Sequence, residues 1–109
     1  MPWELDSDRP IYTQIVDRLK HEIVSGFYPP GSRLPSVRDL AAQASVNPNT
    51  MQKAFTELER TGLIVTRRTS GRTVTEDTAL IEQVRSELAE LQISQFLTRM
   101  QHLGYQKDD

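Results

Sequence analysis

Two short amphipathic segments, separated by a turn of about three residues, place the strongest constraint on how this 109-residue chain folds. The first begins near Ser36, whose hydroxyl can cap the free amides of a helix, with Asp39 three residues further on. The second begins at Asn47-Pro48, because asparagine is a favoured helix cap and proline is favoured at the first helical position. It is predicted to end near Thr61. Two helices joined so tightly have the spacing of a helix-turn-helix unit.

A further amphipathic segment precedes this unit, and two β-prone runs follow it. Apolar residues recur at helical spacing over residues 10–25, which predicts a helix that a turn rich in glycine and proline ends. Residues 63–66 and 72–75 read as two strands joined by a basic turn at residues 67–71. The predicted fold class is therefore mainly α with a small β-hairpin wing, a winged helix-turn-helix.

The remainder of the chain returns to a helical pattern. An apolar stripe starts after Thr78, and Ser94 is predicted to cap a second helix, so two C-terminal α-helices are expected. About 30 residues in two helices cannot bury a core of their own, which favours packing against a second copy of the chain, with packing back onto the same chain as the alternative. The boundary is placed near Thr75, giving a DNA-binding domain at residues 1–75 and a dimerisation tail at residues 76–109. The predicted dimerisation residues are Leu80, Ile81, Val84, Leu88, Leu91, Phe96, Leu97, Met100 and Leu103.

The net charge of −2 hides a gradient along the chain. Residues 33–75 hold seven basic and three acidic side chains, whereas residues 76–109 hold three basic and seven acidic ones, so the two regions are expected to face different partners. The chain has no cysteine, no run of 18 apolar residues and an acidic first segment, which predicts a cytoplasmic protein without a membrane partner. It also has no glycine-rich phosphate loop, nucleophile elbow or metal-binding motif, so neither an enzyme nor a cofactor is expected.

Several short motifs occur together and in a fixed order. They are Pro10-Ile11-Tyr12, Leu34-Pro35-Ser36-Val37-Arg38, Val46-Asn47-Pro48-Asn49-Thr50 and Lys53-Ala54-Phe55. In this order and spacing the chain resembles the GntR family of bacterial transcription regulators over residues 10–75. The short remainder is similar to the YtrA subfamily, whose tail consists of two dimerisation helices instead of a large effector-binding domain.

The resemblance implies which residues contact DNA. Arg38 and the start of the second helix of the motif match operator-contacting positions, and the basic turn matches the wing. Arginine can pair with guanine and asparagine or glutamine with adenine, although Asn47 can also serve as a cap and the turn can be an ordinary solvated hairpin tip. Thr69 stands where the family usually has a glycine, which puts a tight wing tip in doubt. The predicted DNA-contact residues are Arg38, Asn47, Asn49, Thr50, Gln52, Lys53, Arg67, Arg68, Gly71 and Arg72.

The predicted function is that of a sequence-specific DNA-binding transcriptional regulator, a repressor, that binds an inverted-repeat operator as a homodimer. A winged helix used as a protein-interaction module is the competing hypothesis, because a fold alone does not fix function. A small-molecule effector is left open as a further partner. The tail is too short to enclose a pocket of about 300 Å³, so an effector would sit at the dimer interface.

Overall fold

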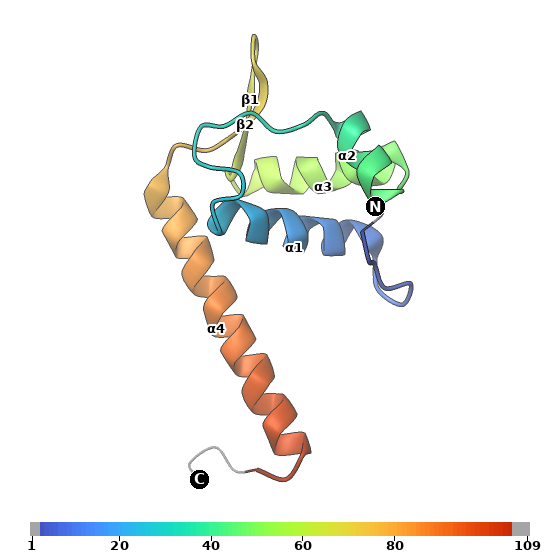
Figure 1. Ribbon diagram of the computed structural model, residues 1–109. Helices are drawn as coiled ribbons and strands as arrows, with labels where there is room; N and C mark the ends of the chain where they lie inside the picture. The colour runs from blue at the N-terminus through green and yellow to red at the C-terminus, as the bar shows by residue number, and fades with distance from the viewer. Residues whose placement is uncertain (1–2, 106–109) are drawn as a thin grey trace.

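The structure consists of a three-helix unit with a β-hairpin on one side and a long helix leaving on the opposite side (Figure 1). The computed structural model describes residues 3–105, so the outermost ends of the two predicted regions, residues 1–2 and 106–109, lie outside it. The winged helix-turn-helix predicted from the sequence is confirmed. The elements are α1 (Ile11–Val24), α2 (Val37–Ala44), α3 (Pro48–Arg60), β1 (Ile64–Arg67), β2 (Gly71–Val74) and α4 (Thr78–His102).

Local capping chemistry sets the helix-turn-helix. The Ser36 hydroxyl accepts a hydrogen bond from the amide of Asp39 at 3.0 Å and so begins α2. The Asn47 side chain accepts one from the amide of Asn49 at 2.7 Å, and Pro48 follows as the first residue of α3. Between the two helices Ser45 adopts a left-handed conformation with φ of 58°. That single reversal lets α3 start immediately after α2.

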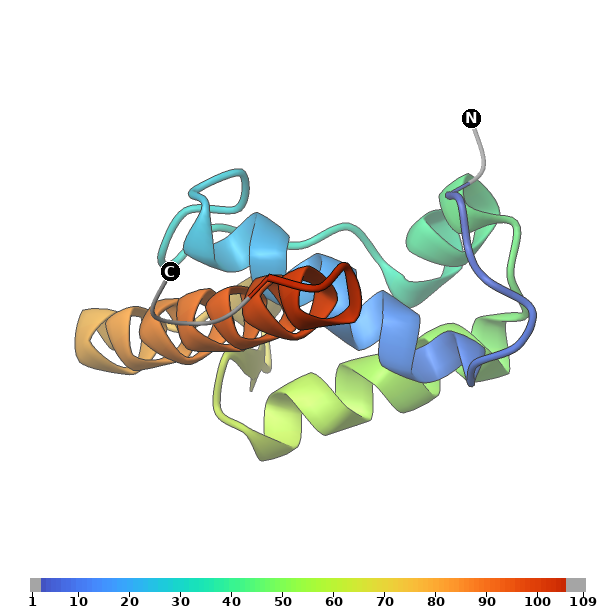
Figure 2. The same ribbon diagram turned by 90° about the horizontal axis from the view of Figure 1, so that it is seen from below.

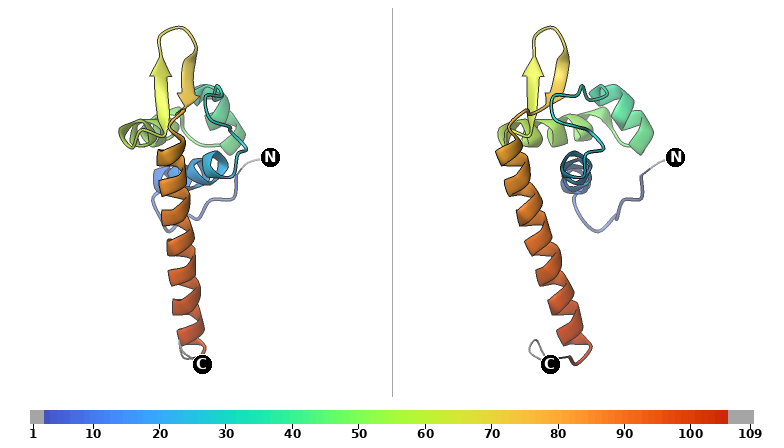
Figure 3. Two further views of the ribbon diagram at one scale, coloured as in Figure 1. Left: turned by 90° about the vertical axis from the view of Figure 1, so that its left-hand side faces the viewer. Right: turned by 60° about the vertical axis from the view of Figure 1, so that its left-hand side comes forward.

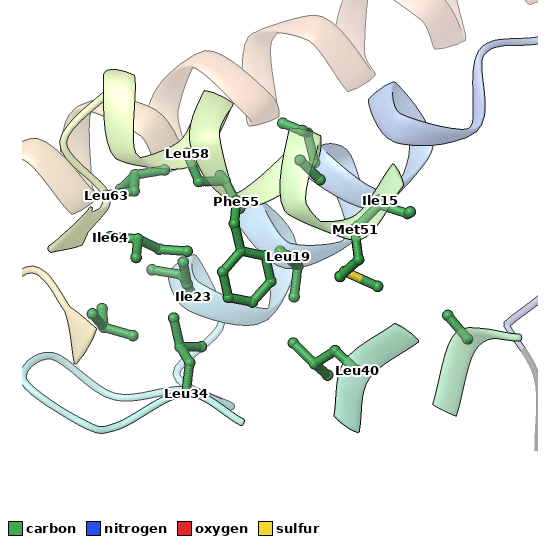
Figure 4. Packing of buried hydrophobic residues seen from close by; sticks show 14 of the residues in the cluster. Ile15, Leu19, Ile23, Leu34, Leu40, Met51, Phe55, Leu58, Leu63 and Ile64 are labelled. Atoms are coloured by element: carbon green, nitrogen blue, oxygen red, sulfur yellow. The ribbon is translucent and has the colours of Figure 1, made fainter. Parts of the chain in front are cut away.

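The hydrophobic core lies between α3, α1 and the base of the hairpin (Figure 4). The helices α1 and α3 run side by side, as the view from below shows (Figure 2). The helix α2 packs against α3 and covers the end of the core that lies away from the hairpin. Phe55 of α3 is fully buried at its centre. The largest fully buried side chains are Ile15, Leu19, Ile23, Leu40, Met51, Phe55, Leu58, Leu63, Ile64 and Val74.

The hairpin is tight even though Thr69 replaces the expected glycine. Strands β1 and β2 pair antiparallel with Arg67 opposite Gly71, and Gly71 takes the left-handed conformation with φ of 74°. Thr69 is not among the residues with positive φ, so the turn needs its glycine at position 71 and not at position 69. The preceding loop covers the free edge of β2, because the Leu34 amide donates to the Arg72 carbonyl and the Val74 amide to the Ser32 carbonyl. Nothing about Thr69 therefore prevents the wing from forming.

The C-terminal region forms one continuous helix, α4, and the prediction of two helices with a break at Ser94 is wrong. Near that position the apolar side chains shift to a different face of the helix, while the backbone stays helical. At about 100° per residue, the stripe from Leu80 to Leu91 and the stripe from Ile93 to Leu103 point in directions that differ by roughly 150° around the helix axis. Serine lies in a helix interior at little cost, so Ser94 does not interrupt it.

The first half of α4 is fixed to its own domain. Ile81 is buried in the core, and Leu80 and Val84 pack against it, so the alternative of packing back onto the chain is correct for these three residues. The Arg85 guanidinium donates to the Val24 carbonyl at the end of α1 at 2.8 and 3.1 Å. The side-chain nitrogen of Gln92 lies 3.1 Å from the ring Nε2 of His21 on α1, and beyond it α4 extends away from the rest of the described chain (Figure 3). Within residues 3–105, no helix has the length and apolar character needed to cross a bilayer.

We expect the Ser45→Gly variant to be more stable than the wild-type protein. A left-handed conformation costs a residue with a side chain roughly 1–2 kcal/mol, and the more flexible unfolded chain of a glycine variant offsets roughly 0.4–1 kcal/mol of the gain. The free energy of unfolding should rise by about 0.5–1 kcal/mol in chemical denaturation. The control Ala42→Gly, on the exposed side of α2, should lose about 1 kcal/mol. Equal losses in both variants would contradict this account.

Candidate nucleic-acid interface

The helix α3 presents two chemically different faces. Its inner face is buried in the core through Met51, Ala54, Phe55 and Leu58, and the opposite face carries exposed polar side chains. Asn49, Gln52 and Thr56 lie on this exposed face, where amide and hydroxyl groups can reach the base edges and phosphates of DNA. The inner face therefore fixes which side chains α3 displays.

The predicted contact residues at the helix starts lie where a DNA-binding surface needs them. Arg38 is exposed on the first turn of α2, and Asn49 and Thr50 lie on the first turn of α3. Asn47 caps α3 through its side-chain oxygen, as the structural interpretation of this residue predicted. In the described part of the chain, the ion pairs do not involve Arg38, Arg67 or Arg68. These arginines keep their full charge available.

A groove of about 520 Å³ connects the start of α2 with the wing. Ser36 and Asp39 line it from the side of α2, and Gly71 and Arg72 line it from the side of the wing. Arg33, which the sequence analysis counted as basic without giving it a role, also lines this groove and is bridged to Thr73 of β2. Its position follows from the pairing of residues 31–34 with β2, which no local pattern indicated.

Arg72 is bound to α3 and does not extend freely from the wing. Its Nε lies 2.8 Å from Oε1 of Glu59, and its guanidinium lies 5.3 Å from the centre of the Phe55 ring. The other Glu59 oxygen accepts a hydrogen bond from the Thr66 hydroxyl at 2.7 Å. The hydrogen bond from Arg72, followed by that from Thr66, lowers the pKa of Glu59 against the effect of partial burial. Glu59 thus ties both strands of the wing to α3.

Gln52 and Lys53 point to different sides of α3 although they are adjacent in sequence. The Gln52 amide donates to the Thr56 hydroxyl at 3.3 Å on the exposed face. The Lys53 ammonium lies toward α1, 3.9 Å from the centre of the Tyr12 ring. The wing residues Arg67 and Arg68 are exposed near the hairpin tip. The predicted contact residues therefore spread over α2, α3 and the wing instead of forming one compact cluster.

Comparison with known proteins decides the family. The family model described as "Bacterial regulatory proteins, gntR family" matches residues 11–74, which is more than half of the chain. The chain belongs to the GntR family. The HTH-type transcriptional repressor YtrA of Bacillus subtilis is a GntR relative that is 40% identical over 100 residues, covering 90% of this chain and 76% of YtrA. The chain is thus a transcriptional regulator with a DNA-binding domain, and not an enzyme.

Solved structures agree with this GntR assignment. A GntR family transcriptional regulator from Listeria monocytogenes superimposes with a TM-score of 0.86 at 43% identity, covering 95% of this chain and 91% of the other. The DNA-binding domain of AraR, solved in complex with operator ORX1, superimposes with a TM-score of 0.58 at 25% identity and covers 69% of this chain and 92% of that domain. The similarity to the Listeria protein includes the long C-terminal helix region as well as the winged domain.

We expect the contact of Glu59 with the wing to make the stability of this GntR protein depend on pH. A carboxyl whose pKa is lowered in the folded state stabilises the fold above its unfolded pKa, and this stabilisation is lost as the pH falls through the folded pKa. The variant Glu59→Gln should be about 1 kcal/mol less stable at pH 7. The difference should shrink as the pH falls below about 4, the ordinary range for glutamate.

Chemical denaturation of the free protein at several pH values measures this effect. Glu90→Gln, which changes an exposed carboxyl on α4, is the matched control and should leave stability unchanged at every pH. A Glu59→Gln difference that stays constant from pH 7 to pH 3 would show that the charge of Glu59 does not stabilise the wing.

Proposed function

We propose that this protein is a sequence-specific repressor that binds an inverted-repeat operator as a homodimer in the cytoplasm. The observation that carries the proposal is the display of Arg38, Asn49 and Gln52 on exposed helix positions beside a basic wing. A recognition helix enters the major groove with its first turns, where these side-chain types read guanine and adenine edges. Two relatives support this proposal, since YtrA is a repressor and the AraR domain was solved bound to its operator.

Affinity and sequence choice would come from different residues. Arg67 and Arg68 of the wing, together with Arg33 in the groove, would contact phosphates and make binding fall steeply with salt. Arg38 and the outer face of α3 would select the sequence. Arg72 would act through the wing that it anchors, and Gly71 through the tight turn. The proposed contacts therefore divide into base-reading residues on α2 and α3 and phosphate-binding residues in and beside the wing.

The exposed apolar face of α4 would hold two subunits together. Phe96 is 52% exposed, Leu103 70% and Ile93, which the sequence analysis missed, 59%. Leu97 and Met100 are half-buried on the same side of the helix. A second copy that packs against this face would remove these apolar side chains from water, a favourable change of about 25 cal/mol per Å². The dimer surface would therefore start near Ile93, because Leu80, Ile81 and Val84 already pack on their own domain and the predicted residues Leu88 and Leu91 continue that stripe on the opposite side of α4.

In this proposal residues 1–75 contact DNA and residues 76–109 form the dimer. A hollow of about 390 Å³ along α4, lined by Ile93, Leu97 and neighbouring polar residues, lies on the proposed dimer face. This hollow is the place where a small-molecule effector would bind between the two copies.

The first experiment measures binding of the purified protein to DNA from just upstream of its own coding region by fluorescence anisotropy at several salt concentrations. We expect Arg38→Ala to weaken specific binding by about 5- to 150-fold, the value of one good base contact. The matched control Arg99→Ala removes the same charge from an exposed position near the end of α4 and should change binding little. Binding that is weak, unselective and unaffected by Arg38→Ala would favour the protein-interaction module instead.

The second experiment tests the dimer. We expect Phe96→Glu to convert the protein to a monomer in analytical ultracentrifugation, because a carboxylate would lie inside an apolar interface. The neighbouring Gln95→Glu introduces the same charge on a different side of α4 and should leave the dimer intact. Both variants should keep the helical content of the wild-type protein. A wild-type protein that sediments as a monomer at micromolar concentration would overturn this part of the proposal.

A further inference from the structure

Tyr12 and Lys53 form a contact between α1 and α3. The Lys53 ammonium lies 3.9 Å from the centre of the Tyr12 ring, well within the range of a cation–π interaction. Tyr12 lies on the first turn of α1, which runs beside α3 (Figure 2). The ring of Tyr12 is half-buried against the core, so its position is fixed by the fold.

This contact holds Lys53 without neutralising it. The carboxylate four residues further along α3, at the spacing of a helical ion pair, belongs to Glu57. That carboxylate is bound by Arg60, whose Nη2 lies 2.7 Å from Oε1. Lysine has three N–H donors, and the ring lies on one side of the ammonium only, so the N–H groups that point away from the ring stay available to an external acceptor. Lys53 is therefore a positioned cation that takes part in none of the ion pairs of residues 3–105.

The place of Lys53 on α3 indicates which acceptor it would meet. It lies one turn beyond Asn49, and it is rotated by about 100° from Gln52 toward α1. A hollow of about 220 Å³ opens at this edge of the helix and is lined by Tyr12, Lys53, Thr56 and the ion-paired residues Glu57 and Arg60. When a recognition helix lies in the major groove, its edges face the two sugar-phosphate backbones while its outer face meets the bases.

We propose, on the basis of the proposed function, that Tyr12 is a positioning residue that holds Lys53 for contact with a backbone phosphate of the operator. The helix α1 then contributes to DNA affinity through the ring of Tyr12. Because the acceptor is a phosphate, Lys53 adds affinity that is nearly independent of the base sequence.

The test measures, on the full chain, the affinity for an operator fragment and for a scrambled duplex as a function of salt. We expect Lys53→Gln to weaken binding to both duplexes by a similar factor and to reduce the slope of log K against log salt by about 0.9. Tyr12→Leu and Tyr12→Met, which remove the ring, should each weaken binding by about 2- to 5-fold. Tyr12→Phe, which keeps the ring and removes the hydroxyl, should restore the wild-type affinity and slope.

A double-variant cycle separates positioning from a general effect on folding. If Tyr12 acts through Lys53, then Tyr12→Leu has no further effect on affinity or salt slope in the Lys53→Gln background. Thermal unfolding identifies which of the variants are folded. An equal loss with and without Lys53, or an unchanged affinity in folded Tyr12→Leu and Tyr12→Met, would overturn the inference alone. Wild-type binding that does not depend on salt would overturn the proposed function, and this inference with it.

Discussion

Burial of the inner face of α3 is the interaction on which the rest of the structure depends. Phe55 and Leu58 are fully buried against α1 and the base of the hairpin (Figure 4). Because side chains follow one another by about 100° around a helix, fixing this face also fixes the direction of Asn49 and Gln52 on the other side. Packing and recognition are thus two consequences of the same helix rotation, and a change that shifts Phe55 would also move the residues that face DNA.

The wing depends on the same helix in a second way. Glu59, on the edge of α3, binds Arg72 of β2 and Thr66 of β1, so the hairpin is held from both strands at one carboxylate. The loop before α2 pairs with the outer edge of β2 and places Arg33 beside the wing. The hairpin is therefore held on two sides, although it has only two strands of its own, which would be marginal in isolation.

Features set by local chemistry could be predicted from the sequence, and features set by contacts between distant residues could not. The caps at Ser36 and Asn47 act over two or three residues, which is why the positions of α2 and α3 were correct. The contacts of Arg72 with Glu59 and of Lys53 with Tyr12 join separate elements and leave no periodic signal. In α4, a change of apolar face was interpreted as a break at Ser94, because periodicity alone does not reveal which neighbour covers each stripe. The DNA and dimer contacts themselves stay predictions.

The change of face within α4 has a mechanical consequence. One rigid rod of 25 residues, about 37 Å long, connects the part that clamps α1 to the part that projects outward. A single residue inserted between Leu88 and Ile93 would move the part of α4 after Ile93 along the helix axis by about 1.5 Å and rotate it about that axis by about 100°. A partner bound to the outer stripe would then change its orientation relative to the winged helix-turn-helix domain, while the residues of α3 stay unchanged. The phase of this one helix can be altered independently of the residues that face DNA.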